Sequence, residues 1–124
     1  MRVPGLPAPL SHYTDAVRFG DLLFISGCAP VDEAGHLVGN GEAAAQARQV
    51  LTHIGTVLRH AGADFADVLK DTGYLLDADD RVAVNKVRKE FFGEFRPAST
   101  LIEVRRLAVP GMVVEIDAVA GISR

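Results

Sequence analysis

The sequence contains one cysteine, Cys28, and no tryptophan. A single cysteine cannot form a disulfide within the chain, so we expect a protein of the reducing cytoplasm. No apolar run approaches the ~20 residues that a membrane-spanning helix needs. The proline-rich start of the chain lacks the apolar stretch of a signal peptide. These absences predict a cytoplasmic protein without a membrane partner.

The sequence also lacks an excess of basic residues. Thirteen Lys and Arg face 16 Asp and Glu, which gives a formal net charge of −3. Nucleic-acid-binding proteins usually present a basic surface, so this balance argues against a nucleic-acid partner. The 124 residues are 48% hydrophobic and 23% charged, as in ordinary globular proteins. We predict one domain over residues 1–124, with an irregular lead-in over the proline-containing residues 1–12.

Local patterns predict a hairpin and a helix in the first half of the chain. Residues 13–27 are typical of a β-hairpin around Gly20-Asp21, because glycine tolerates the positive φ that a type II′ turn requires at its first position. Apolar residues spaced by threes and fours predict a helix from about Glu42 to Ala61. Asn40 is the expected N-cap of this helix, and Gly62 is expected to end it.

A strand and a second helix are predicted next. Residues 68–76 have the apolar content of a strand, and a helix is expected from about Asp80 until Pro97 stops it. Arg88 falls on the polar side of this helix. The expected apolar face of the helix consists of Val84, Val87, Phe91 and Phe95.

The tail is predicted to form a second hairpin over residues 100–119. Pro110-Gly111 suits the centre of a type II turn. Strand alternation places Glu115 on one side of the last strand and Ile116 on the other. A tight hairpin would set Arg106 opposite Glu115 as a cross-strand ion pair, which is a purely structural alternative for this glutamate.

The element order is therefore ββ-α-β-α-ββ. This order predicts an α+β fold with one mixed sheet and two helices packed on one face. The other face of the sheet needs cover. We expect part of it to be an oligomer interface that contains a polar site.

Five short motifs follow one another along the chain. They are Tyr13-Thr14-Asp15-Ala16 with Gly20 to Gly27, Gln46-Ala47-Arg48-Gln49, Val84-Asn85 with Phe91-Phe92, Pro97-Ala98-Ser99-Thr100-Leu101-Ile102-Glu103-Val104, and Val114 to Ala120. Together they cover about residues 13–120. In this order they resemble the RidA/YjgF family of reactive-intermediate (enamine/imine) deaminases, which includes endoribonuclease L-PSP-like proteins.

The resemblance implies a chorismate-mutase-like fold assembled as a homotrimer. It further implies a small-molecule substrate in three intersubunit clefts and a reaction without metal or cofactor, in which an enamine or imine is hydrolysed to a carbonyl compound and ammonia. One position departs from the family. Active deaminases carry Pro-Ala-Arg-Ser where this chain has Pro97-Ala98-Ser99-Thr100, so the arginine that holds the substrate carboxylate is replaced by Ser99. The chain thus resembles the Arg-lacking branch, which includes 2-aminomuconate-type deaminases of aromatic catabolism.

The resemblance also assigns candidate site residues. Glu115 is the expected catalytic residue, because imine hydrolysis needs a group that orients water and moves a proton. Tyr13, Ser99 and Thr100 are expected to line the substrate cleft. Cys28 is interpreted as a small buried residue rather than a nucleophile, and His12 as a loop residue.

Two other functions stay open at this point. The missing arginine also fits a non-catalytic trimer that binds or senses a small molecule. Endoribonuclease activity, reported in the family, would make the chain an RNA-acting protein, and the net negative charge argues against it.

Overall fold

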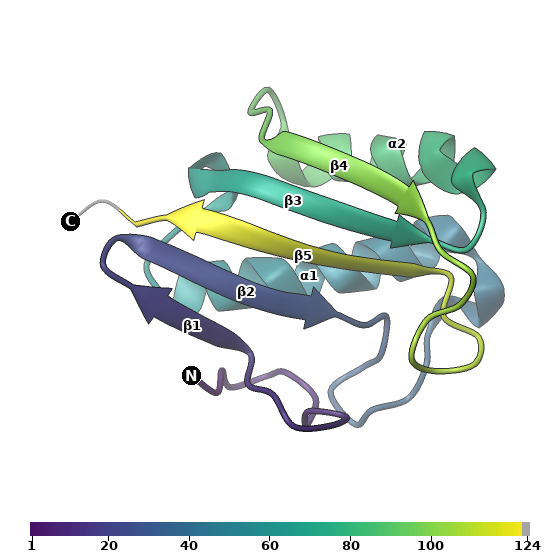
Figure 1. Ribbon diagram of the computed structural model, residues 1–124, viewed down its shortest axis with the longest axis horizontal. Coiled ribbons are helices and arrows are strands. Elements are labelled where there is room, and N and C mark those ends of the chain that lie inside the picture. Colours follow the sequence, from purple (N-terminus) through teal and green to yellow (C-terminus); the bar gives the residue numbers. More distant parts are fainter. Residues whose placement is uncertain (123–124) are drawn as a thin grey trace.

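The computed structural model describes residues 1–122. Five strands and two helices make up its regular structure (Figure 1). They alternate in the predicted order ββ-α-β-α-ββ, with three short 3₁₀ turns between them. The elements are β1 (Ala16–Phe19), β2 (Leu22–Cys28), α1 (Ala43–His60), β3 (Val68–Leu75), α2 (Arg81–Phe92), β4 (Ala98–Glu103) and β5 (Val114–Gly121).

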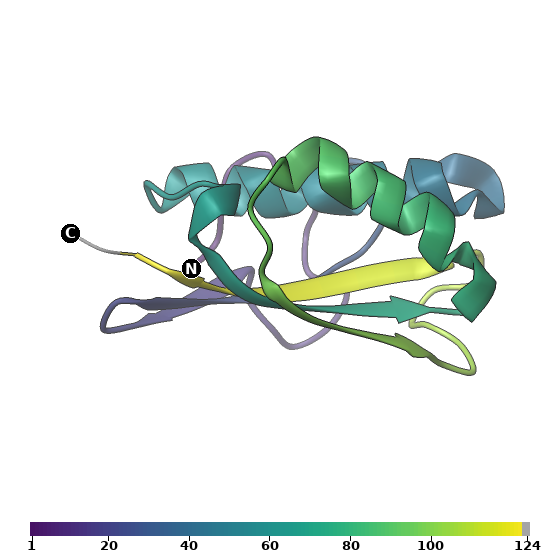
Figure 2. The same ribbon diagram turned by 90° about the horizontal axis from the view of Figure 1, so that it is seen from above.

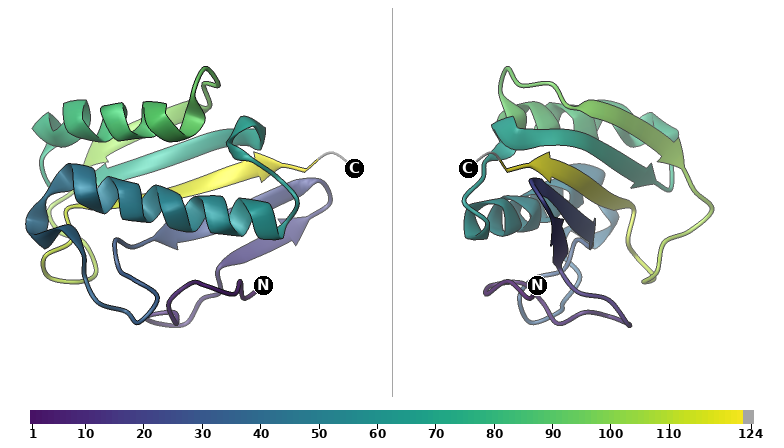
Figure 3. Two further views of the ribbon diagram at one scale, coloured as in Figure 1. Left: turned by 180° about the vertical axis from the view of Figure 1, so that it is seen from behind. Right: turned by 60° about the vertical axis from the view of Figure 1, so that its left-hand side comes forward.

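The strands form one mixed sheet in the order β1-β2-β5-β3-β4. All neighbours are antiparallel except β3 and β4, which are parallel because the chain crosses over through α2 between them. Both helices lie on the same side of the sheet (Figures 2 and 3). The predicted α+β class with two helices on one face is therefore confirmed.

The first hairpin matches its prediction. Phe19 pairs with Leu22, so Gly20 and Asp21 form a two-residue loop, and Gly20 has the positive φ of 59° that this turn requires. β1 is an edge strand, and β2 joins it to the centre of the sheet through β5.

The predicted hairpin of residues 100–119 is wrong. β4 pairs with β3, and β5 pairs with the other side of β3, so β3 separates the two tail strands. The Pro110-Gly111 turn is present, since Met112 N donates to Val109 O at 3.1 Å, but it belongs to a long connection. Glu115 therefore lies opposite Tyr74 rather than Arg106.

Two helix ends also differ from prediction. Asn40 does not cap α1: it lies in a 3₁₀ turn with φ of 42°, and Glu42 takes the N-cap position without a side-chain hydrogen bond. α2 ends at Phe92, before Pro97, because Gly93 adopts a φ of 61° that ends the helix. Phe95 consequently lies outside the helix and is 59% exposed.

The hydrophobic core fills the space between the helices and the sheet. β5 shows the predicted alternation, with Val114, Ile116, Ala118 and Ala120 buried towards the helices. The opposite face of the sheet, called the open face here, has no helix over it. It carries exposed apolar side chains that include Val17, Phe19, Phe24, Leu69 and Ile102, together with Glu115 and Asp117. Over residues 1–122, neither helix has the length and apolar character needed to cross a membrane.

Candidate functional site

Glu115 lies on the open face at the centre of the sheet. Its strand partner is Tyr74 on β3, and Asp117 is the next residue of β5 on the same face. The Tyr74 hydroxyl donates to Asp117 Oδ2 at 2.9 Å, which fixes the Asp117 carboxylate. Partial burial raises the pKa of Glu115, and the negative charge of Asp117 raises it further. A carboxyl with a raised pKa is suited to accept and return a proton near neutral pH.

Gly27 leaves room for the Glu115 carboxylate. The pairing of β2 with β5 is irregular between Ile25 and Cys28, and Gly27 lies in this bulge. A Cβ atom at Gly27 would lie 3.0 Å from Glu115 Cδ and even closer to Oε1. Only glycine therefore allows the carboxylate to rest against the β2 backbone.

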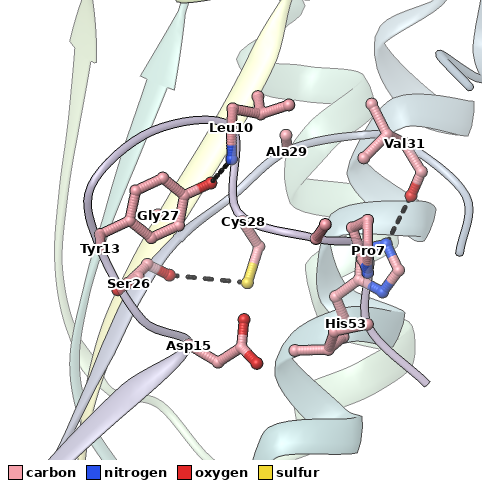
Figure 4. Close-up of a pocket in the computed structure, with 12 residues that line it drawn as sticks. Pro7, Leu10, Tyr13, Asp15, Ser26, Gly27, Cys28, Ala29, Val31 and His53 are labelled. Atoms are coloured by element: carbon pink, nitrogen blue, oxygen red, sulfur yellow. Dashed lines mark hydrogen bonds between the residues drawn. The ribbon is translucent and has the colours of Figure 1, made fainter. Parts of the chain in front are cut away.

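Tyr13 and Gly27 line the same hollow, shown in Figure 4. Residues 6–10 of the N-terminal segment cover it, and the Tyr13 hydroxyl accepts a hydrogen bond from Leu10 N at 3.1 Å. The hollow has a volume of about 40 Å³, which is room for a few water molecules. Gly27 borders both this hollow and the Glu115 carboxylate, but Glu115 itself does not line the hollow.

Cys28 lines the same hollow, but its thiol is not activated. Burial raises the pKa of Cys28 to about 12, and the negative charges of Asp15, Glu115 and Asp117 act in the same direction. The thiol Sγ donates to Ser26 O at 3.5 Å. A thiol that stays protonated is a poor nucleophile, which agrees with the interpretation of Cys28 as a small packed residue.

Thr100 shares the open face with Glu115 but lies further away. It pairs with Thr72, which pairs in turn with Asp117, so two strand spacings of about 10 Å in total separate Thr100 from β5. Its Oγ1 accepts a hydrogen bond from Lys70 Nζ at 2.6 Å. Within one subunit, Thr100 is not a neighbour of the Glu115 carboxylate.

Ser99 lies on the opposite side of the sheet, towards α2. Its Oγ accepts a hydrogen bond from Arg88 Nη2 at 3.1 Å. The same nitrogen contacts both carboxylate oxygens of Asp71, at 3.2 Å and 2.9 Å. Arg88 Nη1 donates to Asn85 Oδ1 at 2.9 Å. The structure thus places the Arg88 guanidinium directly beside the Ser99 hydroxyl.

Arg88 was not predicted as a site residue. It was expected on the polar side of the helix, whereas its side chain is only 19% exposed and reaches the sheet. Arg88 follows the buried Val87, so it sits at the border of the apolar face of α2. A long side chain at such a border can cover apolar surface and still reach a polar partner. Its partner Asp71 is 2% exposed, and a buried carboxylate requires a cation, but this burial is seen only in the folded structure.

The predicted site residues on the sheet therefore form two groups on opposite faces. Glu115 and Thr100 lie on the open face, and Ser99 lies on the side of the helices, beside Arg88. A single subunit cannot bring both groups to one ligand, because the sheet lies between them. Within residues 1–122, no three His, Cys, Asp or Glu side chains are grouped so that they could hold a metal ion.

The chain resembles known proteins over nearly its whole length. A family model described as Endoribonuclease L-PSP matches residues 5–122. The 3-aminoacrylate deaminase RutC of Acinetobacter baylyi is 39% identical over 116 residues, which cover 94% of this chain and 91% of the relative. A 2-iminobutanoate/2-iminopropanoate deaminase of Capra hircus is 39% identical over 114 residues, which cover 92% of this chain and 82% of the relative.

The fold is shared with solved structures. The crystal structure of the YjgF gene product from E. coli superimposes with a TM-score of 0.88 and 31% sequence identity, over 97% of this chain and 95% of that one. The shared fold, the family model and the relatives agree. The chain belongs to the endoribonuclease L-PSP family, also called RidA/YjgF, whose members include enamine and imine deaminases.

Proposed function

We propose that this protein hydrolyses a small enamine or imine to a carbonyl compound and ammonia, with Glu115 as its catalytic residue. The observation that carries this proposal is the half-buried Glu115 carboxyl, whose pKa is raised and which rests against Gly27 beside the Tyr13 hollow. The names of two relatives, a 3-aminoacrylate deaminase and a 2-iminobutanoate/2-iminopropanoate deaminase, support the reaction class.

The proposed chemistry needs one group that moves a proton twice. The substrate reacts as the protonated imine. The Glu115 carboxylate takes a proton from water as the water oxygen attacks the carbon of the C=N bond, which gives a neutral carbinolamine. Glu115 then gives this proton to the nitrogen. The C–N bond breaks as the hydroxyl oxygen forms the C=O bond, the hydroxyl proton passes to the Glu115 carboxylate and on to solvent, and ammonia leaves. An enamine enters the same path after it tautomerises to the imine.

We further propose that the active form is a homotrimer with the substrate in its intersubunit clefts. Two observations support an assembly. The open face carries exposed apolar side chains such as Phe19, Phe24 and Leu69, which a second copy would cover. The two groups of site residues lie on opposite faces of one sheet, so a second subunit is needed to complete a site. Tyr13 and Glu115 of one copy would then meet Ser99 of the next.

The substrate is proposed to differ from that of relatives with the Pro-Ala-Arg-Ser motif, because Ser99 stands in place of their arginine. A serine hydroxyl offers one neutral hydrogen-bond donor, whereas an arginine guanidinium is positively charged and can bind a carboxylate through two N–H groups at once. A 2-aminomuconate-type compound is one candidate within the same reaction class.

The test is hydrolysis of imines generated in situ. An amino-acid oxidase produces 2-imino acids, and semicarbazide traps those that this protein has not hydrolysed. We expect faster loss of imine with the wild-type chain and no such effect with Glu115→Gln. Glu33→Gln, a change at an exposed loop position, serves as the matched control and should keep full activity.

Two results would count against the proposal. Full activity of Glu115→Gln would remove Glu115 from the catalytic role. No activity of the wild-type chain on imino acids and 2-aminomuconate-type compounds, with an active relative as positive control, would favour a non-catalytic trimer that binds a small molecule. Sedimentation velocity on the same samples tests the trimer.

A further inference from the structure

The guanidinium of Arg88 is held in place from three sides. Asp71 on β3 and Ser99 on β4 contact Nη2, and Asn85 of the same helix contacts Nη1. The guanidinium carbon also lies 5.6 Å from the centre of the Phe92 ring. An exposed arginine loses much rotamer freedom when it binds a ligand, but this one is already ordered. The Arg88 guanidinium is therefore preorganised for binding, unlike a mobile arginine at the surface.

Hydrogen-bond donors remain unused at this guanidinium. Arginine has five N–H bonds. In the part of the chain that the structure describes, Asp71 and Ser99 take the donors of Nη2, and Asn85 takes one donor of Nη1. The Nε–H and the second Nη1–H have no acceptor among these residues. The Ser99 hydroxyl accepts from Arg88 and keeps its own O–H free to donate, so unused donors for further acceptors remain at Nε, at Nη1 and at Ser99.

A hollow in front of Arg88 offers space for a ligand. Its volume is about 750 Å³, within the range of small-molecule sites. It lies between the end of α2, the connection to β4, and Ser99. Its walls are formed by Asn85, Arg88, Lys89, Phe92, Gly93, Glu94, Phe95, Arg96, Pro97 and Ser99.

The surroundings of the hollow are positively charged. Lys89 and Arg96 join Arg88 at its wall, against one acidic residue, Glu94. An adjoining hollow along α2 contains Arg81, Lys86, Arg88 and Lys89 and no acidic residue in its lining. Asp71 neutralises part of the Arg88 charge from behind, and the remaining cations still favour an anion.

We propose that Arg88 is the anion-binding group of this protein and that it binds the carboxylate of a small organic acid, assisted by the Ser99 hydroxyl. A carboxylate carries a single negative charge, which matches a guanidinium whose charge is already shared with Asp71. The arginine comes from α2, and Ser99 is small enough to leave it room. This proposal rests on the proposed function in one respect: the acid would be the substrate or product of the same intersubunit cleft.

Direct binding tests the proposal without relying on turnover. The wild-type protein is titrated with 2-oxobutanoate, with its uncharged analogue butanone, and with inorganic phosphate, and binding is followed by calorimetry. We expect 2-oxobutanoate to bind and butanone not to. Arg88→Ala should weaken 2-oxobutanoate roughly 10- to 100-fold, the loss expected for charge-assisted hydrogen bonds. Arg48→Ala, which removes an exposed arginine paired with Glu90, should leave the affinity unchanged.

Arg88→Ala leaves the buried Asp71 without its partner and could unfold the chain. The double variant Asp71→Asn/Arg88→Ala removes both charges together and should fold while it also fails to bind. Adding Ser99→Arg to this double variant returns a guanidinium from β4 and should restore binding to within about tenfold of the wild type. Circular dichroism melting verifies the fold of each variant.

The outcomes separate this proposal from the proposed function. Glu115→Gln should lose imine hydrolysis and keep 2-oxobutanoate binding. A wild-type chain that binds the acid through Arg88 but hydrolyses no imine would overturn the function and leave the anion site intact. Unchanged affinity in the folded double variant would overturn the anion site, whatever the activity. A preference for phosphate over 2-oxobutanoate would overturn the carboxylate assignment.

Discussion

Replacing Gly27 with alanine should reduce activity far more than stability. The added methyl group would lie 3.0 Å from Glu115 Cδ and closer to Oε1. The β2 backbone cannot easily retreat, since Ile25 and Cys28 pair with β5 on either side of Gly27. Glu115 must therefore rotate away. Gly27 does not have a positive φ, so alanine introduces no backbone strain of its own.

The magnitudes follow from this geometry. Forcing a side chain about 30° from its rotamer costs about 1 kcal/mol, which corresponds to a loss of roughly 4 °C in Tm for a domain of this size. Misplacing a reacting group by about 1 Å costs on the order of 100-fold in rate. We therefore expect kcat for imine hydrolysis to fall about 100-fold, while Tm falls by only about 4 °C.

The matched control is Gly73→Ala on β3. A Cβ there would make ordinary contact with the Leu101 side chain at 3.9 Å, and Gly73 also lacks a positive φ. Coupled ammonia release and thermal unfolding are measured on both variants. Wild-type activity in Gly27→Ala, or an equal loss in Gly73→Ala, would refute the argument that Gly27 positions the Glu115 carboxylate.

Three other substitutions test the electrostatics of the chain. Asp117→Asn removes a charge that raises the pKa of Glu115, so the acidic limb of the pH–rate profile should move to lower pH; an unmoved limb would contradict the coupling. Glu115→Gln should raise Tm at pH 7 and lose this gain near pH 4, because a carboxyl whose pKa is raised in the folded state destabilises the fold only when it is ionised. Equal gains in Tm at both pH values would contradict this sign. Asp15 is 8% exposed and accepts hydrogen bonds from Val3 N at 2.7 Å and from Arg2. Asp15→Ala should therefore lower the free energy of unfolding in urea by about 2 kcal/mol, and a loss below about 0.5 kcal/mol would show that these hydrogen bonds do not stabilise the fold.

Local patterns in the sequence were sufficient for most of the fold. The apolar stripe of α1 and the alternation of Glu115 and Ile116 along β5 depend only on neighbouring residues, and both predictions are confirmed. Strand pairing depends on residues far apart in the sequence, so local patterns do not determine it. A turn at Pro110-Gly111 predicts a hairpin, but the crossover through α2 allows β3 to take the place between β4 and β5.

The site, too, was predicted where local motifs were sufficient and missed where packing between distant elements decides. The family motifs led to Glu115, Tyr13, Ser99 and Thr100, yet strand parity alone could not tell which faces Glu115 and Ser99 would take once β3 lay between their strands. Arg88 was missed because its partner Asp71 lies 17 residues earlier, on another element. A salt bridge of that kind becomes visible only when helix and sheet are packed together.

The separation of Glu115 and Arg88 on opposite faces of one sheet has a genetic consequence. Under the proposed assembly, each cleft takes one face from each of two copies, so Glu115→Gln and the double variant Asp71→Asn/Arg88→Ala inactivate different halves of a cleft. Subunits of the two inactive variants, unfolded and refolded together in equal amounts, would form about a quarter of their clefts from two intact halves. Two dead alleles of this gene would then complement each other within one cell.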